Sequence, residues 1–171
     1  MPKLVYFLNI YVMLCSLLVA EEQILATLVS VKSNGIQKLG ISNYTFPCES
    51  YGVLTLEKLY DNSNIDSVCQ NTIKDFYKKY PELEYYSASI LHVKQMYHIE
   101  FKKQECVLYA RGQKILSELL LEEGLAVLNP LFQDEEYAYT FNKAQANAKF
   151  YKKGLWQEDT LGACMDSLYG E

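Results

Sequence analysis

The spacing of apolar residues is strand-like in the first part of the chain and helix-like in later segments. The order of these segments is the feature that most constrains the fold. Residues 23–31 run apolar and alternating, as a β-strand does. Ser33-Asn34-Gly35 is a turn signal that leads into a second strand over 36–42, so a hairpin is expected. Residues 43–45 are interpreted as a loop, and residues 50–54 as a short third strand.

The period lengthens to that of a helix after residue 66. Asp66 or Ser67 is the expected N-cap, and Pro81 ends the helix. Its buried stripe is expected to consist of Cys69, Ile73, Phe76 and Tyr80. Residues 87–101 then predict a long strand, or two strands with a bulge, and residues 105–111 predict its partner.

Two further helices follow these strands. The first covers 114–123, with Gly124 as its C-terminal cap. The second begins at the acidic run 134–136, where the helix dipole favours carboxylates, and Gly154 stops it after a cluster of lysines. Its buried face is expected to consist of Tyr137, Phe141, Ala144, Ala148 and Tyr151.

This order of strands and helices predicts an α+β fold in one domain over 21–159, followed by a tail of residues 160–171. Residues 1–20 resemble an export signal, with Lys3 at the positive end and Ala20 at a plausible cleavage point. An uncleaved membrane anchor is the alternative, since about 17–25 apolar residues are needed to span a bilayer. The expected location is therefore periplasmic or secreted, or anchored by this segment.

Four cysteines remain after an export signal is removed, and an exported chain with four cysteines is expected to form two disulfides. Four buried thiols are the alternative. The pairing that we predict is Cys48 with Cys69 and Cys106 with Cys164. Asn43-Tyr44-Thr45 fits the N-x-T pattern of a glycosylation acceptor, which requires a glycosylating host.

The charge of the chain argues against nucleic acid as a partner. Removing residues 1–20 takes away one lysine and no acid, which leaves 15 basic against 21 acidic residues and a net charge of −6. Arg111 is the only arginine in the sequence. Proteins that hold nucleic acid neutralise phosphates with lysine and arginine, and arginine alone offers a two-pronged fork.

The second half of the chain resembles the staphylococcal-nuclease-like (thermonuclease) family. The resemblance is carried by E-L-L-L-E-E-G-L-A within residues 107–128 and by A-x-A-x-x-x-x-K-G-L-W within 141–159. It extends more weakly over residues 23–159. It implies an oligonucleotide-binding-type five-stranded β-barrel with three helices.

The resemblance also implies a site for calcium-dependent cleavage of phosphodiesters, built from aspartates, a threonine carbonyl, a glutamate and two arginines. The family motif D-G-D-T falls on residues 32–35 here, where Asn34 offers only a neutral oxygen. The motif R-L-x-G-[IV]-D-x-P-E falls on residues 49–57, with Glu49 in place of the arginine and Leu54 in place of the metal-binding aspartate.

Three residues of that site keep some of the expected chemistry. Thr55 and Glu57 match the threonine and glutamate of some members, and Lys103 lies near the position of the second arginine. The implied metal ligands are Asn34 and Thr55, and the implied catalytic residues are Glu57 and Lys103. The alternative is that Glu57 and Lys103 are ordinary surface charges.

Two functions follow from this comparison. The first is an exported module, expected to be monomeric and free of cofactors, that has lost phosphodiesterase activity and binds a protein or a component of the cell envelope. The second is a divergent metal-dependent endonuclease that uses calcium and the four residues named above. A nucleic-acid binder without catalysis is a third, weaker interpretation, and its binding would weaken steeply with salt.

Overall fold

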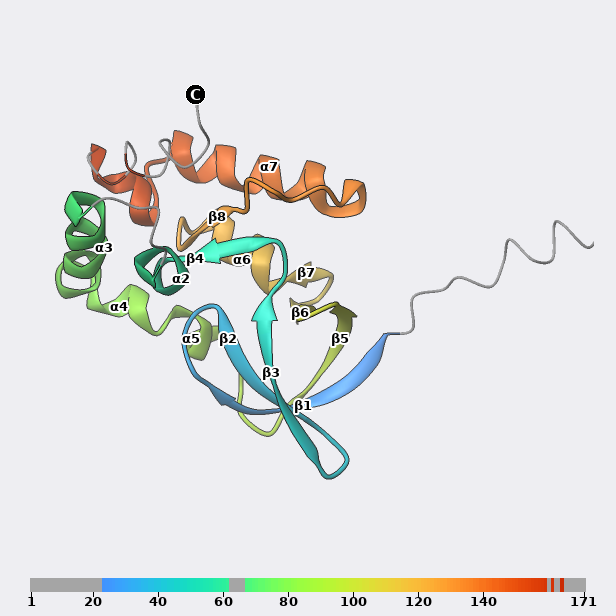
Figure 1. Cartoon of the computed structure of the whole chain (residues 1–171). Coiled ribbons are helices and arrows are strands. Elements are labelled where there is room, and N and C mark those ends of the chain that lie inside the picture. Colours follow the sequence, from blue (N-terminus) through green and yellow to red (C-terminus); the bar gives the residue numbers. More distant parts are fainter. Residues whose placement is uncertain (1–22, 62–66, 160, 162–163, 165–171) are drawn as a thin grey trace, which may run out of the picture.

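The computed structural model describes residues 23–61, 67–159, 161 and 164. Its centre is a closed mixed barrel, which lies in the lower half of Figure 1 with helices packed above and to one side. The strands run in the order β3-β2-β1-β5-β6, and β3 also pairs with β6 to close the barrel. These strands are β1 (Ile24–Val31), β2 (Ile36–Ile41), β3 (Tyr44–Ser50), β5 (Met96–Lys102) and β6 (Glu105–Arg111).

Most strand pairs of the barrel are antiparallel, and the closing pair is parallel. In that pair Glu49 lies opposite Glu105 and Ser50 lies opposite Cys106. A short strand, β7 (Lys114–Ile115), extends the sheet beside β6. A second small sheet pairs β4 (Val53–Thr55) with β8 (Ala126–Leu128) and carries the chain from the barrel into the helical layer.

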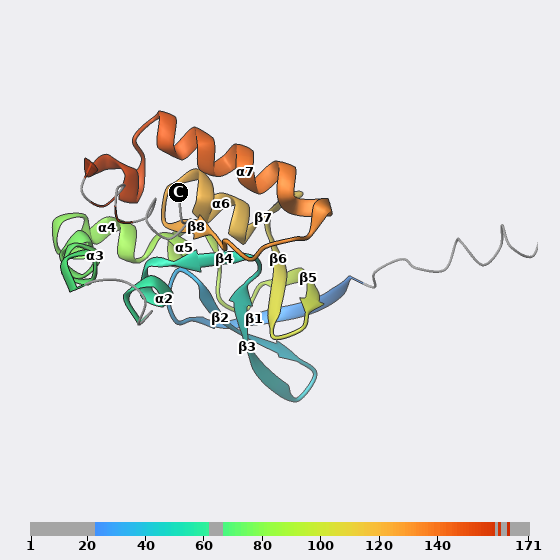
Figure 2. The same cartoon turned by 45° about the horizontal axis from the view of Figure 1, so that its top comes forward.

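The helices lie together on one side of the barrel, as the two views in Figures 1 and 2 show. They are α2 (Leu56–Asp61), α3 (Ser67–Lys79), α4 (Pro81–Glu84), α5 (Tyr86–Ile90), α6 (Leu116–Glu122), α7 (Glu135–Phe150) and the 3-10 helix η1 (Gly154–Gln157). The predicted α+β fold with a five-stranded barrel is confirmed. The three predicted helices correspond to α3, α6 and α7, and within the described residues the structure adds four short ones, α2, α4, α5 and η1.

Helix α7 shows how local sequence and packing agree. The Asp134 side chain accepts a hydrogen bond from the backbone N–H of Glu136, which caps the first turn. Tyr137, Phe141, Ala144 and Ala148 form the buried face. Tyr151 was predicted to share that face but is 67% exposed, and it lies at the C-cap, one residue past the end of the helix at Phe150.

The core joins the barrel to the helices. Leu28 and Leu39 fill the barrel side, and Leu116, Leu120 and Phe141 come from the helices, all with side chains almost wholly buried. Each such side chain contributes about 1.5–3 kcal/mol to folding by leaving water. Within the described residues, no helix is both long enough and apolar enough to cross a membrane.

The long strand predicted over 87–101 is wrong in its first half. Residues Tyr86–Ile90 form α5, and strand β5 begins only at Met96, after a turn in which Lys94 has a positive φ of 72°. The cause is tertiary, because the backbone N–H of Ser87 donates to Asn34 Oδ1 at 2.9 Å and fixes the first turn of α5.

The loop predicted over 43–45 is also wrong in part, since strand β3 already begins at Tyr44. It passes through Pro47, a residue that usually interrupts a central strand. Strand β3 meets β6 only at Glu49 and Ser50, so Pro47 has a single neighbouring strand, β2. This edge position accepts a residue that has no N–H to donate.

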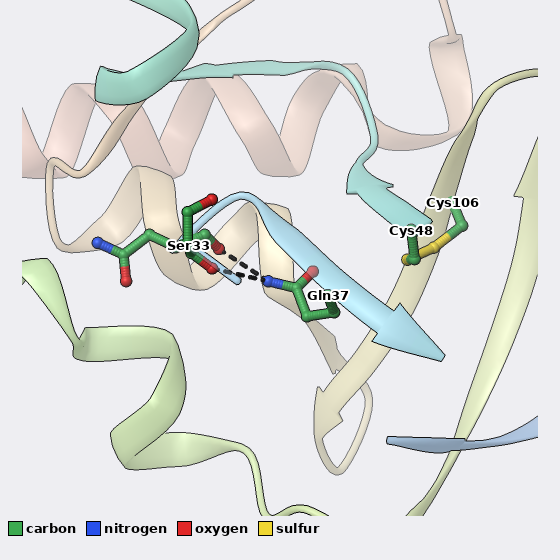
Figure 3. Close-up of a disulfide and its surroundings, with 5 residues drawn as sticks. Ser33, Gln37, Cys48 and Cys106 are labelled. Carbon is green, nitrogen blue, oxygen red and sulfur yellow. Dashed lines mark hydrogen bonds between the residues drawn. A yellow bond between two sulfur atoms is a disulfide. The ribbon is translucent and has the colours of Figure 1, made fainter. Parts of the chain in front are cut away.

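The two disulfides join Cys48 to Cys106 and Cys69 to Cys164, with Cα–Cα distances of 5.5 and 5.6 Å. The predicted pairing of Cys48 with Cys69 and Cys106 with Cys164 is therefore wrong. Barrel closure brings β3 beside β6, so Cys48 and Cys106 meet although 58 residues separate them (Figure 3). The second disulfide joins Cys69 of α3 to Cys164. The predicted export signal over 1–20 and most of the predicted tail over 160–171 lie outside the described residues.

Candidate functional site

Asn34, an implied metal ligand, lies in the turn between β1 and β2 and is 1% exposed. Its Nδ2 donates to the Leu83 carbonyl at 2.8 Å and to the Tyr77 hydroxyl at 3.2 Å. Its Oδ1 accepts the Ser87 backbone N–H at 2.9 Å. Both ends of the carboxamide therefore bind helices α3 to α5, and the side chain acts as a tie between the barrel and the helical layer.

The backbone of the same turn is held equally firmly. The Asn34 carbonyl accepts from the Ser87 hydroxyl at 2.8 Å and from Gln37 Nε2 at 3.0 Å. Gln37 Nε2 also approaches the Ser33 carbonyl, at 3.3 Å, and Figure 3 shows this side chain folded back over the turn. Gln37 is fully buried inside the barrel. The turn is thus held by hydrogen bonds from Gln37 of its own hairpin and from Ser87 of α5.

Thr55, the second implied metal ligand, is at the end of β4 and is 3% exposed. Thr55 packs directly on the turn between β1 and β2, since a Cβ placed on Gly35 would lie 2.5 Å from Thr55 Cγ2 and 2.8 Å from Thr55 Oγ1. A residue larger than glycine at position 35 would have to displace Thr55. The space between these two segments is therefore filled by the threonine side chain itself.

Glu57 lies in the first turn of α2 and is linked to Asn34 through a residue that sequence reasoning missed. The Tyr77 hydroxyl donates to Glu57 Oε1 at 3.3 Å and accepts from Asn34 Nδ2. Burial, followed by the negative charge of Glu57, raises the pKa of Tyr77, so the phenol stays neutral. Glu57 Oε2 is buried and has no hydrogen-bond partner among the described residues. The structure thus brings Asn34, Thr55 and Glu57 together.

Lys103, the other implied catalytic residue, is exposed in the turn between β5 and β6, with a positive φ of 60°. In the described part of the chain, no hydrogen bond or ion pair joins it to Asn34, Thr55 or Glu57. It lines a separate cavity of about 620 Å³ whose wall includes Tyr51 and Phe132. The four implied residues are therefore placed as a cluster of three and one separate lysine.

The position implied for the first arginine carries a compact group of charges instead. Lys58 Nζ lies 2.6 Å from Glu49 Oε2 and 3.6 Å from Glu105 Oε1. Glu49 and Glu105 face each other across the parallel pair that closes the barrel, and Glu105 Oε2 also accepts the Gly52 N–H at 2.9 Å. The lysine charge is thus shared by two carboxylates, and the group as a whole is negative.

The residues present do not fit a calcium site. Calcium takes six to eight oxygen ligands, several of them carboxylates. Here the cluster offers one carboxylate, from Glu57, while Asn34 Oδ1 already accepts a backbone N–H and Leu54 stands at an aspartate position. Among the described residues, no three His, Cys, Asp or Glu side chains gather where they could hold a metal ion.

A buried carboxylate outside this cluster was also missed by sequence reasoning. Glu100 is 6% exposed and accepts hydrogen bonds from Tyr109 at 2.6 Å, Tyr137 at 3.1 Å and Gln23 at 3.2 Å. Burial acts to raise the pKa of Glu100, but these three donors, with Lys102 nearby, outweigh it and lower the pKa. A cavity of about 480 Å³ adjoins the three donors.

Comparison with known proteins agrees with this architecture. The family described as staphylococcal nuclease homologue matches residues 74–158, which run from within α3 to just past η1. No curated protein matches the chain. The matched segment contains Lys103 and leaves out Asn34, Thr55 and Glu57. The chain therefore contains a staphylococcal-nuclease-like domain, and its closed five-stranded barrel with helices is consistent with that fold.

Proposed function

We propose that this domain has lost phosphodiesterase activity and acts outside the cytoplasm as a binding or structural module. The observation that carries the proposal is the group formed by Glu49, Lys58 and Glu105. Phosphodiester cleavage needs positive charge at the scissile phosphate. A group with two carboxylates and one lysine repels that phosphate instead.

The state of Asn34 supports the same proposal. Both ends of its carboxamide already form hydrogen bonds to the helices that pack on the barrel. We therefore infer that this turn stabilises the fold and does not bind an ion. The acidic balance of the chain also disfavours nucleic acid as a ligand. A protein or a component of the cell envelope is the partner that we propose, with the domain itself a monomer.

An exposed apolar face supports a protein partner. Leu25 and Val29 on β1 and Met96 on β5 are 49%, 40% and 63% exposed. Thr27 lies between the two β1 side chains and opposite Met96, so the three share the outer face of the sheet. Exposed apolar patches on folded domains often mark binding surfaces.

Export is proposed on the two disulfides, because such bonds persist in oxidising compartments and are rare in reducing ones. The signal-like character of residues 1–20 agrees with it.

The second candidate is a divergent metal-dependent endonuclease, and one observation favours it. Asn34, Thr55 and Glu57 lie together, and Glu57 Oε2 is a buried oxygen without a partner among the described residues. Such an oxygen can act as a base or meet a cation. Lys103 would need to approach this cluster for the site to be complete.

A cleavage assay separates the two candidates. The purified protein is incubated with single-stranded DNA over a calcium titration, beside a heat-inactivated sample and the Glu57→Gln variant. The proposal expects no cleavage above the heat-inactivated sample and no saturable heat of calcium binding in calorimetry. Calcium-dependent cleavage that disappears in Glu57→Gln would overturn it, whereas cleavage equal in both proteins would indicate a contaminating nuclease.

A further inference from the structure

The hairpin of β2 and β3 ends in a two-residue turn that projects from the barrel. Ile41 and Tyr44 are the last paired residues, and Ser42 and Asn43 connect them. Ser42 has a positive φ of 53°, which sets the tight reversal. In both Figure 1 and Figure 2 this tip lies on the side of the barrel away from the helices.

The residues at this tip are exposed to solvent. Residues 42–45 are all exposed, and Tyr44 reaches 81%. The Asn43 carboxamide makes no hydrogen bond to any residue in the described part of the chain. Its Nδ2 is therefore available to a reagent or an enzyme that approaches from outside.

The three residues Asn43-Tyr44-Thr45 form the N-x-T pattern, with no proline at its centre. No other asparagine of the sequence is followed two residues later by serine or threonine. Acceptors of this pattern lie in surface loops of exported proteins. We propose that Asn43 is the acceptor for an N-linked oligosaccharide, an inference that rests on the export proposed above.

The donor of the sugar is a lipid-diphosphate-linked oligosaccharide, and an oligosaccharide transferase catalyses the transfer. Asn43 Nδ2 forms a bond to C1 of the first sugar. The bond between that C1 and the diphosphate oxygen breaks, and the lipid diphosphate leaves with the electron pair. The proton lost from Nδ2 passes to a base of the transferase, so no oxidant or reductant is needed.

The position of Asn43 gives the modification a physical consequence. Residues 44–48 of β3 have a strand on one side only, so this stretch is an open sheet edge. Open edges invite pairing with other chains, and proteins protect them with proline, with charged side chains or by covering the edge. Pro47 already interrupts the edge, and a glycan on Asn43 covers the end that proline leaves accessible.

The test uses the full chain, with its own residues 1–20, produced in cultured insect cells. Protein recovered from the medium is expected to migrate more slowly than after treatment with a peptide N-glycosidase. Peptide mass spectrometry is expected to find residue 43 converted to aspartate after that treatment. Thr45→Ser should keep the shift, whereas Thr45→Ala and Asn43→Gln should abolish it completely. Asn142→Gln, at an exposed asparagine outside the pattern, should keep it.

Two outcomes would overturn the proposal in distinguishable ways. Secreted, disulfide-bonded protein with unmodified Asn43 would refute the acceptor while export stands. Protein that stays in the cytoplasm would refute export by its own N-terminus, and a version with a host signal sequence in place of residues 1–20 then decides the acceptor. A glycosylated Asn43 in that version would support the site, and an unmodified one would remove it.

Discussion

Asn34 and Tyr77 meet across the boundary between the barrel and its helices, with 3.2 Å between the asparagine Nδ2 and the phenol oxygen. This contact converts a turn that the family resemblance assigns to ion binding into a structural joint. The phenol passes the connection on to Glu57. Asn34 and Glu57, which the family resemblance places in the site, therefore both take part in hydrogen bonds at the boundary between the barrel and its helices.

Replacing Asn34 by alanine is expected to lower the free energy of unfolding by about 3 kcal/mol. The change removes three side-chain hydrogen bonds and leaves the Leu83 carbonyl and the Ser87 N–H without their partner in a buried place. Urea unfolding followed by circular dichroism measures the difference. Asn142→Ala, at an exposed position of α7, is the matched control and should change stability by less than about 0.5 kcal/mol. Equal effects of the two variants would show that the joint contributes nothing.

The elements that sequence predicts well are those whose local pattern matches their packing. Cys69, Ile73 and Phe76 lie on the buried side of α3 as their spacing requires, and Gly124 ends α6 with a φ of 65°. Helix α5 could not be predicted in this way, because its first turn is held by Asn34, 53 residues away.

The site, too, contains contacts with distant residues that a local sequence pattern does not predict. The resemblance locates Asn34, Thr55 and Glu57, but sequence alone does not reveal that Tyr77 connects two of them. Tyr77 is one of 15 tyrosines in the sequence, and nothing in its spacing marks it. Lys58 is equally unmarked, although it neutralises the charge at Glu49. The contacts that Tyr77 and Lys58 make from neighbouring helices can be identified only in the folded structure.

Removing the cation at position 58 is expected to expose the repulsion between its two partners. In Lys58→Gln, Glu49 and Glu105 face each other across β3 and β6 without a positive charge between them. The loss should be about 1 kcal/mol, because these side chains are roughly one-third exposed and water screens them. The double variant Glu49→Gln/Lys58→Gln should recover most of it. Urea unfolding at low and high sodium chloride checks this, since salt should shrink the loss.

The disulfide pairing gives a direct chemical prediction. Proteolysis without reduction should release one linked peptide pair that contains Cys48 and Cys106 and another that contains Cys69 and Cys164. Replacing Cys48 and Cys106 together by alanine should cost about 2–4 kcal/mol, because the bond restricts a loop of 58 residues in the unfolded chain. Mass spectrometry identifies the peptides, and a fragment that links Cys48 to Cys69 would contradict the structure.

Glu100 predicts how stability changes with pH. In the unfolded chain its carboxyl has the ordinary pKa of 4.5, and in the fold the bonds from Tyr109, Gln23 and Tyr137 outweigh the opposing effect of burial and lower that pKa. A lowered carboxyl pKa stabilises the fold above the unfolded value, and the contribution is lost as pH falls from about 4.5 through the folded value. Glu100→Gln should therefore cost about 2 kcal/mol at pH 7, and the difference from the wild type should shrink at pH 3.

Two tyrosine variants isolate the cause of this pH dependence. Tyr137→Phe removes one donor to Glu100 Oε2 and should weaken the acid-dependent part of the stability. Tyr139→Phe, two residues along the same helix and 76% exposed, has no contact with Glu100 among the described residues and should leave the profile unchanged. Unfolding free energies measured from pH 3 to pH 7 provide the comparison. Identical profiles for both variants would show that the Tyr137 bond does not hold the carboxylate in its charged form.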